Sequence, residues 1–532
     1  MKTFKSTINN KSASFRSNKE AMEVLVEKLN SFLKITKIQG SELALKRAKE
    51  RGKSLSREKI EKLLDKNSPF IELMPLAGLK HENGFGPGGT TIAGIGFVNK
   101  KICVINANIG TKKGGVVDYA TSLKNLRISQ IAKENKLTTI NLVESGGANL
   151  PDQDRVFNNY GTMFKEMSKR SKDGIITISI VFGNATAGGA YVPGMSDYTI
   201  MQKDQAKVFL AGPPLVKMAT NEDSTDEELG GALMHNNLSG VSDFLAKDEN
   251  EAIKMAREIV ELNVIDKSIQ KIKDTNPPKY DKDEILGIIP YNLKIPFDIR
   301  DLIVRFVDDS KFLEFKSSYG ITMKCGWSKI NNYKIGIIAS NGVIFSEAAK
   351  KASQFIQLAN KSNTPLLFIH NTTGFMVGKR YEQKGIINHG AQLIHAVTGS
   401  EVPHITLLVG NSYGAGNYAM CGRSFEPRFL FSYPNVKSGV MGAEQLAGVM
   451  EILKINSAKK LNIKIDKRKL NKEKKELIQQ AEEKASIWHT TSEVMDDGVI
   501  DPRNTRSHLK LCLEIIYKEK IIGSKSFGTF RF

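Results

Sequence analysis

The sequence predicts an α/β protein that consists of two similar halves. From about residue 90 onward, short apolar segments alternate with helical segments, which is typical of α/β proteins. Glycine-rich segments also recur in the same order in both halves of the chain. With 532 residues the chain has room for two large domains or three medium ones, so a duplicated architecture fits its length.

The N-terminal half begins with helices and continues with strands. Met22, Leu25, Leu29 and Leu33 recur at helical spacing, so we expect helices within residues 20–65. Apolar runs predict buried strands at 102–105, 138–143 and 175–182. A helix is expected over about 119–135, between the first two strands.

A proline-rich stretch divides the chain near its middle. Within 20 residues lie Pro277, Pro278, Pro290 and Pro296. Proline restricts the backbone and lacks an amide donor, so this stretch is the best candidate for a linker. We therefore expect one domain over 1–276 and another over 277–532. In the second domain we expect strands at 335–339, 366–369 and 405–409. This domain also contains the lysine-rich stretch, which is followed by a helix that is expected to end near Trp488.

Matching segments indicate an internal duplication. Residues 183–191 (GNATAGGAY) and 410–418 (GNSYGAGNY) each follow a predicted strand and match without a gap, at an offset of 227. Two further pairs match in the same order: 144–148 with 370–374, at an offset of 226, and 99–102 with 331–334. Three ordered matches at nearly one offset are not expected by chance, so the halves are predicted to be copies.

The excess of positive charge lies mostly at two margins. The chain has 77 Lys and Arg against 57 Asp and Glu, a net charge of +20. Residues 1–19 and 454–475 together hold 13 of these 20 charges. A nucleic-acid-binding protein would be expected to interleave aromatic residues with its basic ones, and 454–475 contains none. We interpret 454–475 as a solvated helical face and expect no nucleic-acid partner.

Cysteine usage and hydropathy limit the class of protein further. Cys103, Cys325, Cys421 and Cys512 form no CxxC pair, so neither a zinc ribbon nor a disulfide framework is predicted, and a reducing compartment fits. No window approaches 18 consecutive apolar residues, so no membrane-spanning helix is expected. The acid-free N-terminus lacks the amphipathic pattern of a transit peptide.

The two glycine segments point to stabilisation of an anion by the backbone. A strand that ends in small residues before a short helix exposes N–H groups that no side chain obstructs. Two such donors, aimed at a carbonyl oxygen, stabilise the charge that develops when the carbonyl becomes an enolate. A single loop of this kind is more often only a tight turn. Two loops at equivalent places favour the catalytic interpretation.

Another interpretation of the second loop is a serine hydrolase. Residues 410–414 fit the G-x-S-x-G elbow, with Ser412 as nucleophile and His489 or His508 as base. The candidates for an orienting acid are Asp466, Asp496 and Asp497. The first copy has Ala185 in place of the serine, which counts against this reading. His235 and His389 also lie near glycines. Neither has metal-ligand spacing around it, and both are more typical of structural residues.

The ordered motifs identify a family. Over nearly its whole length the chain resembles the carboxyltransferase (β) subunits of biotin-dependent acyl-CoA carboxylases, nearest to the methylcrotonyl-CoA and geranyl-CoA branch. The segments that carry the resemblance are 145–151 (SGGANLP), 186–193 (TAGGAYVP), 211–215 (AGPPL), 228–231 (ELGG) with His235, 239–240 (SG), 341–342 (NG), 373–378 (TGFMVG), 413–423 (YGAGNYAMCGR) and 496–502 (DDGVIDP). The start of bacterial members resembles residues 14–22, so we expect the N-terminus to be mature protein.

The resemblance implies a fold and a division of labour. The fold is expected to be two tandem crotonase-like domains related by duplication. Enolate stabilisation falls on Gly188 and Gly189 in the N-terminal domain, and on Ala415 and Gly416 in the C-terminal domain. The implied acyl-CoA-binding residues are Ser145, Gly146, Gly147, Ala148, Ala190, Tyr191, Gly212 and Pro213. The implied biotin-binding residues are Thr373, Gly374, Phe375, Met376, Val377, Asn417 and Tyr418.

The resemblance also implies a reaction and partners. Carboxybiotin, carried by a biotinylated α subunit, gives up CO₂, and its freed nitrogen deprotonates the acyl-CoA, so that no general base or metal of this chain is required. The expected substrate is 3-methylcrotonyl-CoA, which gives 3-methylglutaconyl-CoA in leucine degradation. The expected assembly is a β hexamer within an α₆β₆ complex. We expect it in the bacterial cytoplasm, or in the mitochondrial matrix of a eukaryote.

Departures from the family pattern leave the substrate open. The sequence has Val116-Val117 where two tyrosines are usual, and Glu144 where aspartate is usual. Both changes are expected to affect the acyl pocket, so geranyl-CoA and propionyl-CoA remain alternatives. A biotin-dependent acyl-CoA decarboxylase uses a similar subunit. A crotonase-fold hydratase would need a glutamate beside its glycine loop, and residues 183–195 and 410–423 contain none.

Overall fold

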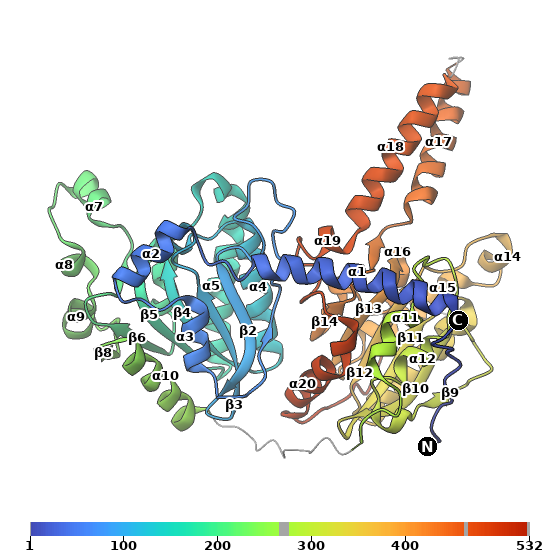
Figure 1. The fold of residues 1–532 in the computed structure, drawn as a ribbon, viewed down its shortest axis with the longest axis horizontal. Helices are drawn as coiled ribbons and strands as arrows, with labels where there is room; N and C mark the ends of the chain where they lie inside the picture. Colours follow the sequence, from blue (N-terminus) through green and yellow to red (C-terminus); the bar gives the residue numbers. More distant parts are fainter. Residues whose placement is uncertain (1, 265–275, 462–465, 529–532) are drawn as a thin grey trace. The chain divides into compact units, whose positions relative to one another are not determined.

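The computed structural model describes residues 2–264, 276–461 and 466–528. The chain divides into two compact units, each with its own sheet (Figure 1). The N-terminal unit comprises 31–268 and 491–494, and the C-terminal unit comprises 1–30, 269–490 and 495–532. The first 30 residues therefore cluster with the C-terminal half of the chain, although the sequence analysis grouped them with the N-terminal half.

The N-terminal unit is built on an eight-stranded sheet. Its strands are β1 (Ile71–Glu72), β2 (Thr91–Val98), β3 (Lys101–Asn108), β4 (Thr138–Ser145), β5 (Thr177–Thr186), β6 (Tyr198–Gln202), β7 (Lys207–Phe209) and β8 (Phe244–Ala246). The order is β1-β2-β3-β4-β5-β6-β8, and β7 pairs with the end of β5. Its longer helices are α2 (Glu42–Glu50), α3 (Ser56–Leu63), α4 (Tyr119–Glu134), α5 (Gln153–Lys172), α7 (Pro213–Thr220) and α10 (Glu249–Asn263).

The C-terminal unit is built on a seven-stranded sheet. Its strands are β9 (Leu313–Phe315), β10 (Met323–Ile330), β11 (Tyr333–Ser340), β12 (Leu366–Thr372), β13 (His404–Tyr413), β14 (Phe429–Ser432) and β15 (Lys437–Gly439). The order is β14-β13-β12-β11-β10-β9, and β15 pairs with β13. Its helices include α12 (Ile299–Ile303), α13 (Ser346–Lys361), α15 (Ile386–Thr398), α16 (Gly414–Ala419), α17 (Ala443–Lys460), α18 (Lys467–Ala485), α19 (Ile487–Thr490) and α20 (Thr505–Tyr517). Helix α1 (Ala13–Ile35) crosses the boundary between the units.

The two sheets repeat each other in register, which confirms the predicted duplication. After an irregularity in the β4–β5 ladder Ser145 pairs with Ala185, and after the same irregularity in the β12–β13 ladder Thr372 pairs with Ser412. Both offsets are 227, so the predicted match of 144–148 with 370–374 is out by one residue. Helices α4 and α13 have the same length of 16 residues. The segment between β3 and α4 is five residues longer than its counterpart, which explains the different offset of the earliest match.

The described residues of the lysine-rich stretch lie mostly on helices α17 and α18, which have no counterpart among the described residues of the N-terminal unit. Helices α17 and α18 pack against each other, and residues 462–465 between them lie outside the described part of the chain (Figure 1). Lys454 pairs with Glu473 (2.7 Å), and Lys474 pairs with Glu451 (2.6 Å). Part of the predicted solvated face therefore joins the two helices. Exposed pairs of this kind contribute little individually.

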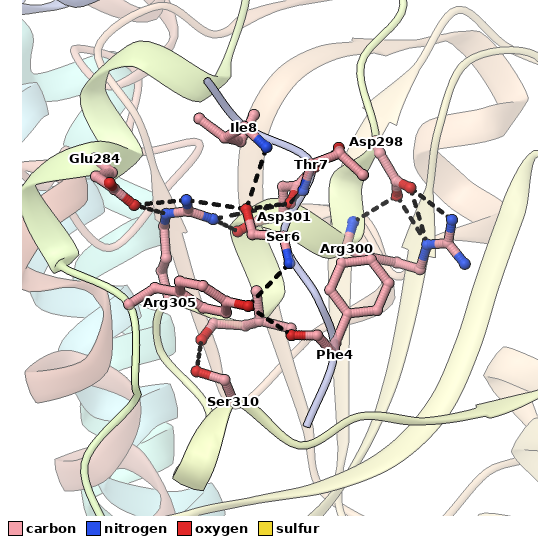
Figure 2. A network of polar contacts seen from close by, with 12 residues as sticks. Phe4, Ser6, Thr7, Ile8, Glu284, Asp298, Arg300, Asp301, Arg305 and Ser310 are labelled. Carbon is pink, nitrogen blue, oxygen red and sulfur yellow. Dashed lines mark hydrogen bonds and ion pairs between the residues drawn. The ribbon is translucent and has the colours of Figure 1, made fainter. Parts of the chain in front are cut away.

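Residues 4–8 are held on the C-terminal unit by a buried polar network (Figure 2). Asp301, which is 1% exposed, accepts hydrogen bonds from Ser6 Oγ (2.6 Å), Thr7 N–H (3.0 Å) and Thr7 Oγ1 (2.8 Å). Arg305, which is also buried, donates to Glu284 Oε2 (2.6 Å) and to the Asp301 carbonyl (2.6 Å). The charges are thus paired, as buried charges must be.

Two expectations from hydropathy and cysteine spacing can be compared with the structure. Within the described ranges, no helix is long and apolar enough to cross a membrane. The four cysteines are buried.

Candidate functional site: two equivalent glycine turns

The first turn begins where β5 ends. Ala187 has a φ of +53°, a left-handed conformation that costs an L-residue about 1–2 kcal/mol. It reverses the chain into the short helices η3 (Ala187–Ala190) and α6 (Tyr191–Gly194). The first N–H groups of a helix have no partner within it, and those of Gly188 and Gly189 belong to this set. The turn therefore presents two adjacent backbone donors at the end of the central strand.

Close packing behind the first turn requires small residues. A Cβ on Gly189 would lie 3.2 Å from Ser145 Oγ, and one on Gly188 would lie 3.3 Å from the Tyr160 ring. Ser145 itself is fixed, because its hydroxyl donates to the Gly115 carbonyl (3.0 Å) and accepts from Gly147 N–H (3.3 Å). The end of β4 thus supports the donors of the turn that follows β5.

The second turn has the same construction. Gly414, at the position equivalent to Ala187, has a φ of +54° and leads from β13 into α16. Ala415 and Gly416 occupy the first turn of α16, where N–H groups have no partner within the helix. A Cβ on Gly416 would lie 2.9 Å from the Cα of Gly374, and Gly374 N–H donates to Thr372 Oγ1 (3.1 Å). Here too the preceding strand supports the turn, as Ser145 and Gly147 do in the first.

The structure brings several of the predicted residues together in each unit. In the N-terminal unit, Gly146 N–H donates to the Gly114 carbonyl, and Ala148 forms an isolated bridge with Val117. In the C-terminal unit the equivalent bridge joins Phe375 to Ile344, and Met376 N–H donates to the Ile344 carbonyl.

The remaining predicted residues lie at the margins of the turns. Ala190 is buried, whereas Tyr191 is half-exposed and packs on Phe164. Gly212 and Pro213 begin α7, just beyond β7, which is the strand paired with the end of β5. Among the predicted biotin-binding residues, Val377 is exposed and Tyr418 stacks on Phe425. Asn417 Nδ2 donates to Ser412 Oγ (2.8 Å). Thr373 follows directly after β12.

A cavity that sequence reasoning missed lies beside the first turn. Gly189, Ser145 and Val117 line it together with polar side chains of β3, β4, α4 and α5. Val117 therefore does face the predicted acyl site. Glu144 does not line this cavity, because its carboxylate pairs with Lys53 (2.9 Å) and Lys59 (3.8 Å). The available signal was the presence of asparagines within two otherwise apolar strands.

Ser412 is not positioned as a hydrolase nucleophile. It is fully buried, and its partner is His370 (Oγ to Nδ1, 2.8 Å), not His489 or His508. Because His370 Nε2 donates to the Met420 carbonyl (2.6 Å), Nδ1 accepts from the serine. Burial lowers the pKa of His370 to about 4, so it remains neutral at physiological pH. This pair joins β12 to β13 and serves the fold.

Two of the other polar candidates, His235 and Asp497, also have structural partners. His235 bonds Ser239 and the Val208 carbonyl, both at 2.6 Å. The buried Asp497 pairs with Arg423 (2.8 Å) and accepts from Leu430 N–H. His389 is buried on α15, and burial lowers its pKa. In the described ranges, no group of three His, Cys, Asp or Glu residues is placed to hold a metal ion.

The chain is similar to known proteins over nearly its whole length. Residues 47–530 match the model of the carboxyl transferase domain. The chain is 47% identical to a probable biotin-dependent acyl-coenzyme A carboxylase beta2 subunit of Mycobacterium tuberculosis, with 99% of each chain covered. It is 44% identical to the mitochondrial methylcrotonoyl-CoA carboxylase beta chain of Dictyostelium discoideum, covering 99% of this chain and 90% of the other.

A solved structure resembles the whole fold. The β subunit of Pseudomonas aeruginosa geranyl-CoA carboxylase superposes with a TM-score of 0.91, at 38% identity and with 100% of both chains covered. This likeness confirms the prediction of two tandem crotonase-like domains.

Proposed function

The chain belongs to the carboxyl transferase family, and from this premise we propose that its two glycine turns are the two oxyanion holes of carboxyl transfer from carboxybiotin to an acyl-CoA. The observation that carries the proposal is the equivalence of the turns. Each has a left-handed residue, adjacent free N–H donors and a supporting strand with the same irregularity. The reaction needs two negatively charged oxygens to be stabilised, and two such holes supply that stabilisation.

In the N-terminal unit, the N–H groups of Gly188 and Gly189 would receive the thioester oxygen of the acyl-CoA. As a proton leaves the acyl group, charge develops on this oxygen and both donors bind it more strongly. Ser145 holds the turn in place through its bonds to Gly115 and Gly147. Removal of one donor of this kind typically lowers the rate by about 10²–10³.

In the C-terminal unit, the N–H groups of Ala415 and Gly416 would receive the ureido oxygen of biotin. The absence of a side chain at Gly416 and Gly374 fits this group, because a Cβ on Gly416 would close the cradle. Bound carboxybiotin supplies CO₂ and, afterwards, a basic ureido nitrogen. The residues of α16 orient the ring and stabilise charge on its oxygen, so no general base of the chain is needed.

For the acyl group we propose 3-methylcrotonyl-CoA, by analogy with the names of the relatives. Geranyl-CoA and propionyl-CoA are the alternatives, and a decarboxylase role is a more remote one. The proposed partner is a biotin-carrying α subunit, in an α₆β₆ complex with a β hexamer. The proposed location is the cytoplasm of a bacterium, or the mitochondrial matrix if the source is eukaryotic.

The decisive experiment is an assay of the purified α–β complex with bicarbonate, ATP and a panel of acyl-CoAs. Turnover of at least one acyl-CoA is expected, and a preference for 3-methylcrotonyl-CoA would fix the branch. Gly189→Val should abolish transfer, while the control Gly161→Val, at an exposed helical position with nothing within 4 Å, should not. If no acyl-CoA were carboxylated, or if Gly189→Val kept wild-type activity, the assignment would be wrong.

A further inference from the structure

The cavity beside the first glycine turn has an unusually polar lining. It opens about 50 Å³ to water-sized groups, several times the roughly 10–15 Å³ that one water needs. At one end it is lined by Ser145 and Gly189, which belong to the proposed thioester hole. Deeper in the unit its polar lining includes Asn106, Asn125, Ser129, Asn141, Tyr160 and Arg170.

The equivalent positions of the C-terminal unit are occupied by apolar residues. In the N-terminal sheet, Asn106 pairs with Asn141 across β3 and β4. In the C-terminal sheet, the pair in the same register is Ile338 and Phe368, and both are fully buried. On the covering helix, Asn125 and Ser129 of α4 stand where α13 has Ala352 and Ile356. The duplicated scaffold is therefore compatible with an apolar filling, and the N-terminal unit departs from it.

The polar groups of the cavity do not satisfy one another. Five of their atoms are buried and have no hydrogen-bond partner in the described structure: Asn106 Oδ1, Asn125 Oδ1, Ser129 Oγ, Tyr160 OH and Arg170 Nε. Each such atom costs about 1–3 kcal/mol. A fold that could use aliphatic side chains here carries this cost without benefit, unless water or a ligand completes the bonds.

Arg170 gives the cavity a positive charge. Its side chain projects from α5, is 3% exposed, and donates from Nη1 to Thr139 Oγ1 (2.6 Å). It forms no ion pair with any residue in the described ranges. Burial lowers its pKa to about 10, so it stays protonated at neutral pH. Glu166 and Asp197 raise its pKa from a distance without forming an ion pair with it, so the buried guanidinium can still pair with an anionic ligand.

Since the cavity begins at the proposed thioester hole, we propose that it receives the far end of the acyl group, and that, besides 3-methylcrotonyl-CoA, the enzyme accepts acyl thioesters whose chain ends in a carboxylate and prefers them to uncharged thioesters of equal length. This inference rests on the proposed function and specifies its substrate class. Arg170 would pair with the terminal carboxylate, and Tyr160 and Ser129 would donate to it.

The test compares two thioesters of equal chain length, hexanoyl-CoA and adipoyl-CoA. Binding of each to the β subunit is measured by calorimetry, and kcat/KM is measured with the α–β complex. The wild-type chain should favour adipoyl-CoA by at least about tenfold in both measurements. Arg170→Met should remove this preference while keeping the affinity for hexanoyl-CoA, and Arg170→Lys should restore part of it. The control is Arg155→Met, an exposed arginine of the same helix, which should change nothing.

A second variant covers the case in which Arg170→Met does not fold. Asn141→Phe introduces the residue of the C-terminal unit at this register and should block adipoyl-CoA more than 3-methylcrotonyl-CoA. Equal affinities of the wild type for the matched pair, or equal losses for both in Arg170→Met, would mean that the cavity holds only water and would overturn the inference. Turnover of hexanoyl-CoA or 3-methylcrotonyl-CoA in that case would leave the proposed function intact. No binding or turnover of any thioester would defeat both.

Discussion

The substitutions Gly416→Ala and Gly189→Ala should affect the two proposed holes unequally. A Cβ on Gly416 would lie 2.9 Å from the backbone Cα of Gly374, whereas carbon atoms pack at about 3.5 Å. The turn must therefore open by about 0.6 Å. Misplacement by 1 Å can lower a rate about 10²-fold, so we expect Gly416→Ala to slow transfer by about 10- to 50-fold. A Cβ on Gly189 would overlap less, because its nearest atom is Ser145 Oγ at 3.2 Å, so the loss should stay below about fivefold.

The assay separates the two holes. Release of CO₂ from a carboxylated α subunit, without acyl-CoA present, depends only on the C-terminal hole. Gly416→Ala should slow both this release and the complete transfer, while Gly189→Ala should slow only the transfer. Equal slowing of CO₂ release by both variants would refute the division of roles, as would wild-type release by Gly416→Ala.

Three further predictions concern stability and pH. Both Ala187 and Gly414 have a left-handed backbone, which favours glycine. Ala187→Gly should therefore raise the free energy of unfolding by about 0.5–1 kcal/mol, and Gly414→Ala should lower it by about 1–2 kcal/mol. Thermal denaturation of the two variants would show whether the melting temperature shifts in opposite directions. Asp301→Ala should destabilise the C-terminal unit by about 3–5 kcal/mol, because Ser6 and Thr7 lose their buried acceptor and Arg305 keeps Glu284 as its only carboxylate within 4 Å in the described ranges. The denaturant midpoint measures this loss, and an unchanged midpoint would contradict it. Burial lowers the pKa of Lys124 to about 8. The unfolded chain keeps this proton up to about pH 10, so stability should rise with pH between about 8 and 10, and Lys124→Met should lose that rise.

Much of the fold could be predicted because it depends on local patterns. The six predicted strands coincide with or overlap β3, β4, β5, β11, β12 and β13, since apolar runs bounded by glycine turns have few other solutions. The glycine motifs likewise marked both turns. The one-residue error in the offset of 144–148 shows that the loop residues alone did not fix the alignment, whereas the strand pairing aligns Ser145 with Thr372.

The cavity and the Ser412–His370 pair could not be predicted in the same way. Asn106, Asn141 and Arg170 lie on three different elements, and only the pairing of β3 with β4 and the packing of α5 bring them to one place. Similarly, His370 lies 42 residues before Ser412 and faces it only because β12 and β13 are neighbours. Such long-range contacts depend on the register in which the strands pair, which a single sequence does not determine. The asparagines were visible in the sequence, but their burial was not.

The anchoring of residues 4–8 has a consequence for dissecting the chain. A fragment cut at the proline-rich stretch would separate Asp301 from Ser6 and Thr7, although all three belong to one unit. The C-terminal fragment should then expose a buried carboxylate and tend to aggregate, while a synthetic peptide of residues 2–30 should bind it and restore its solubility. During synthesis, residues 4–8 would thus find their binding site only after Asp301 and Arg305 have been made.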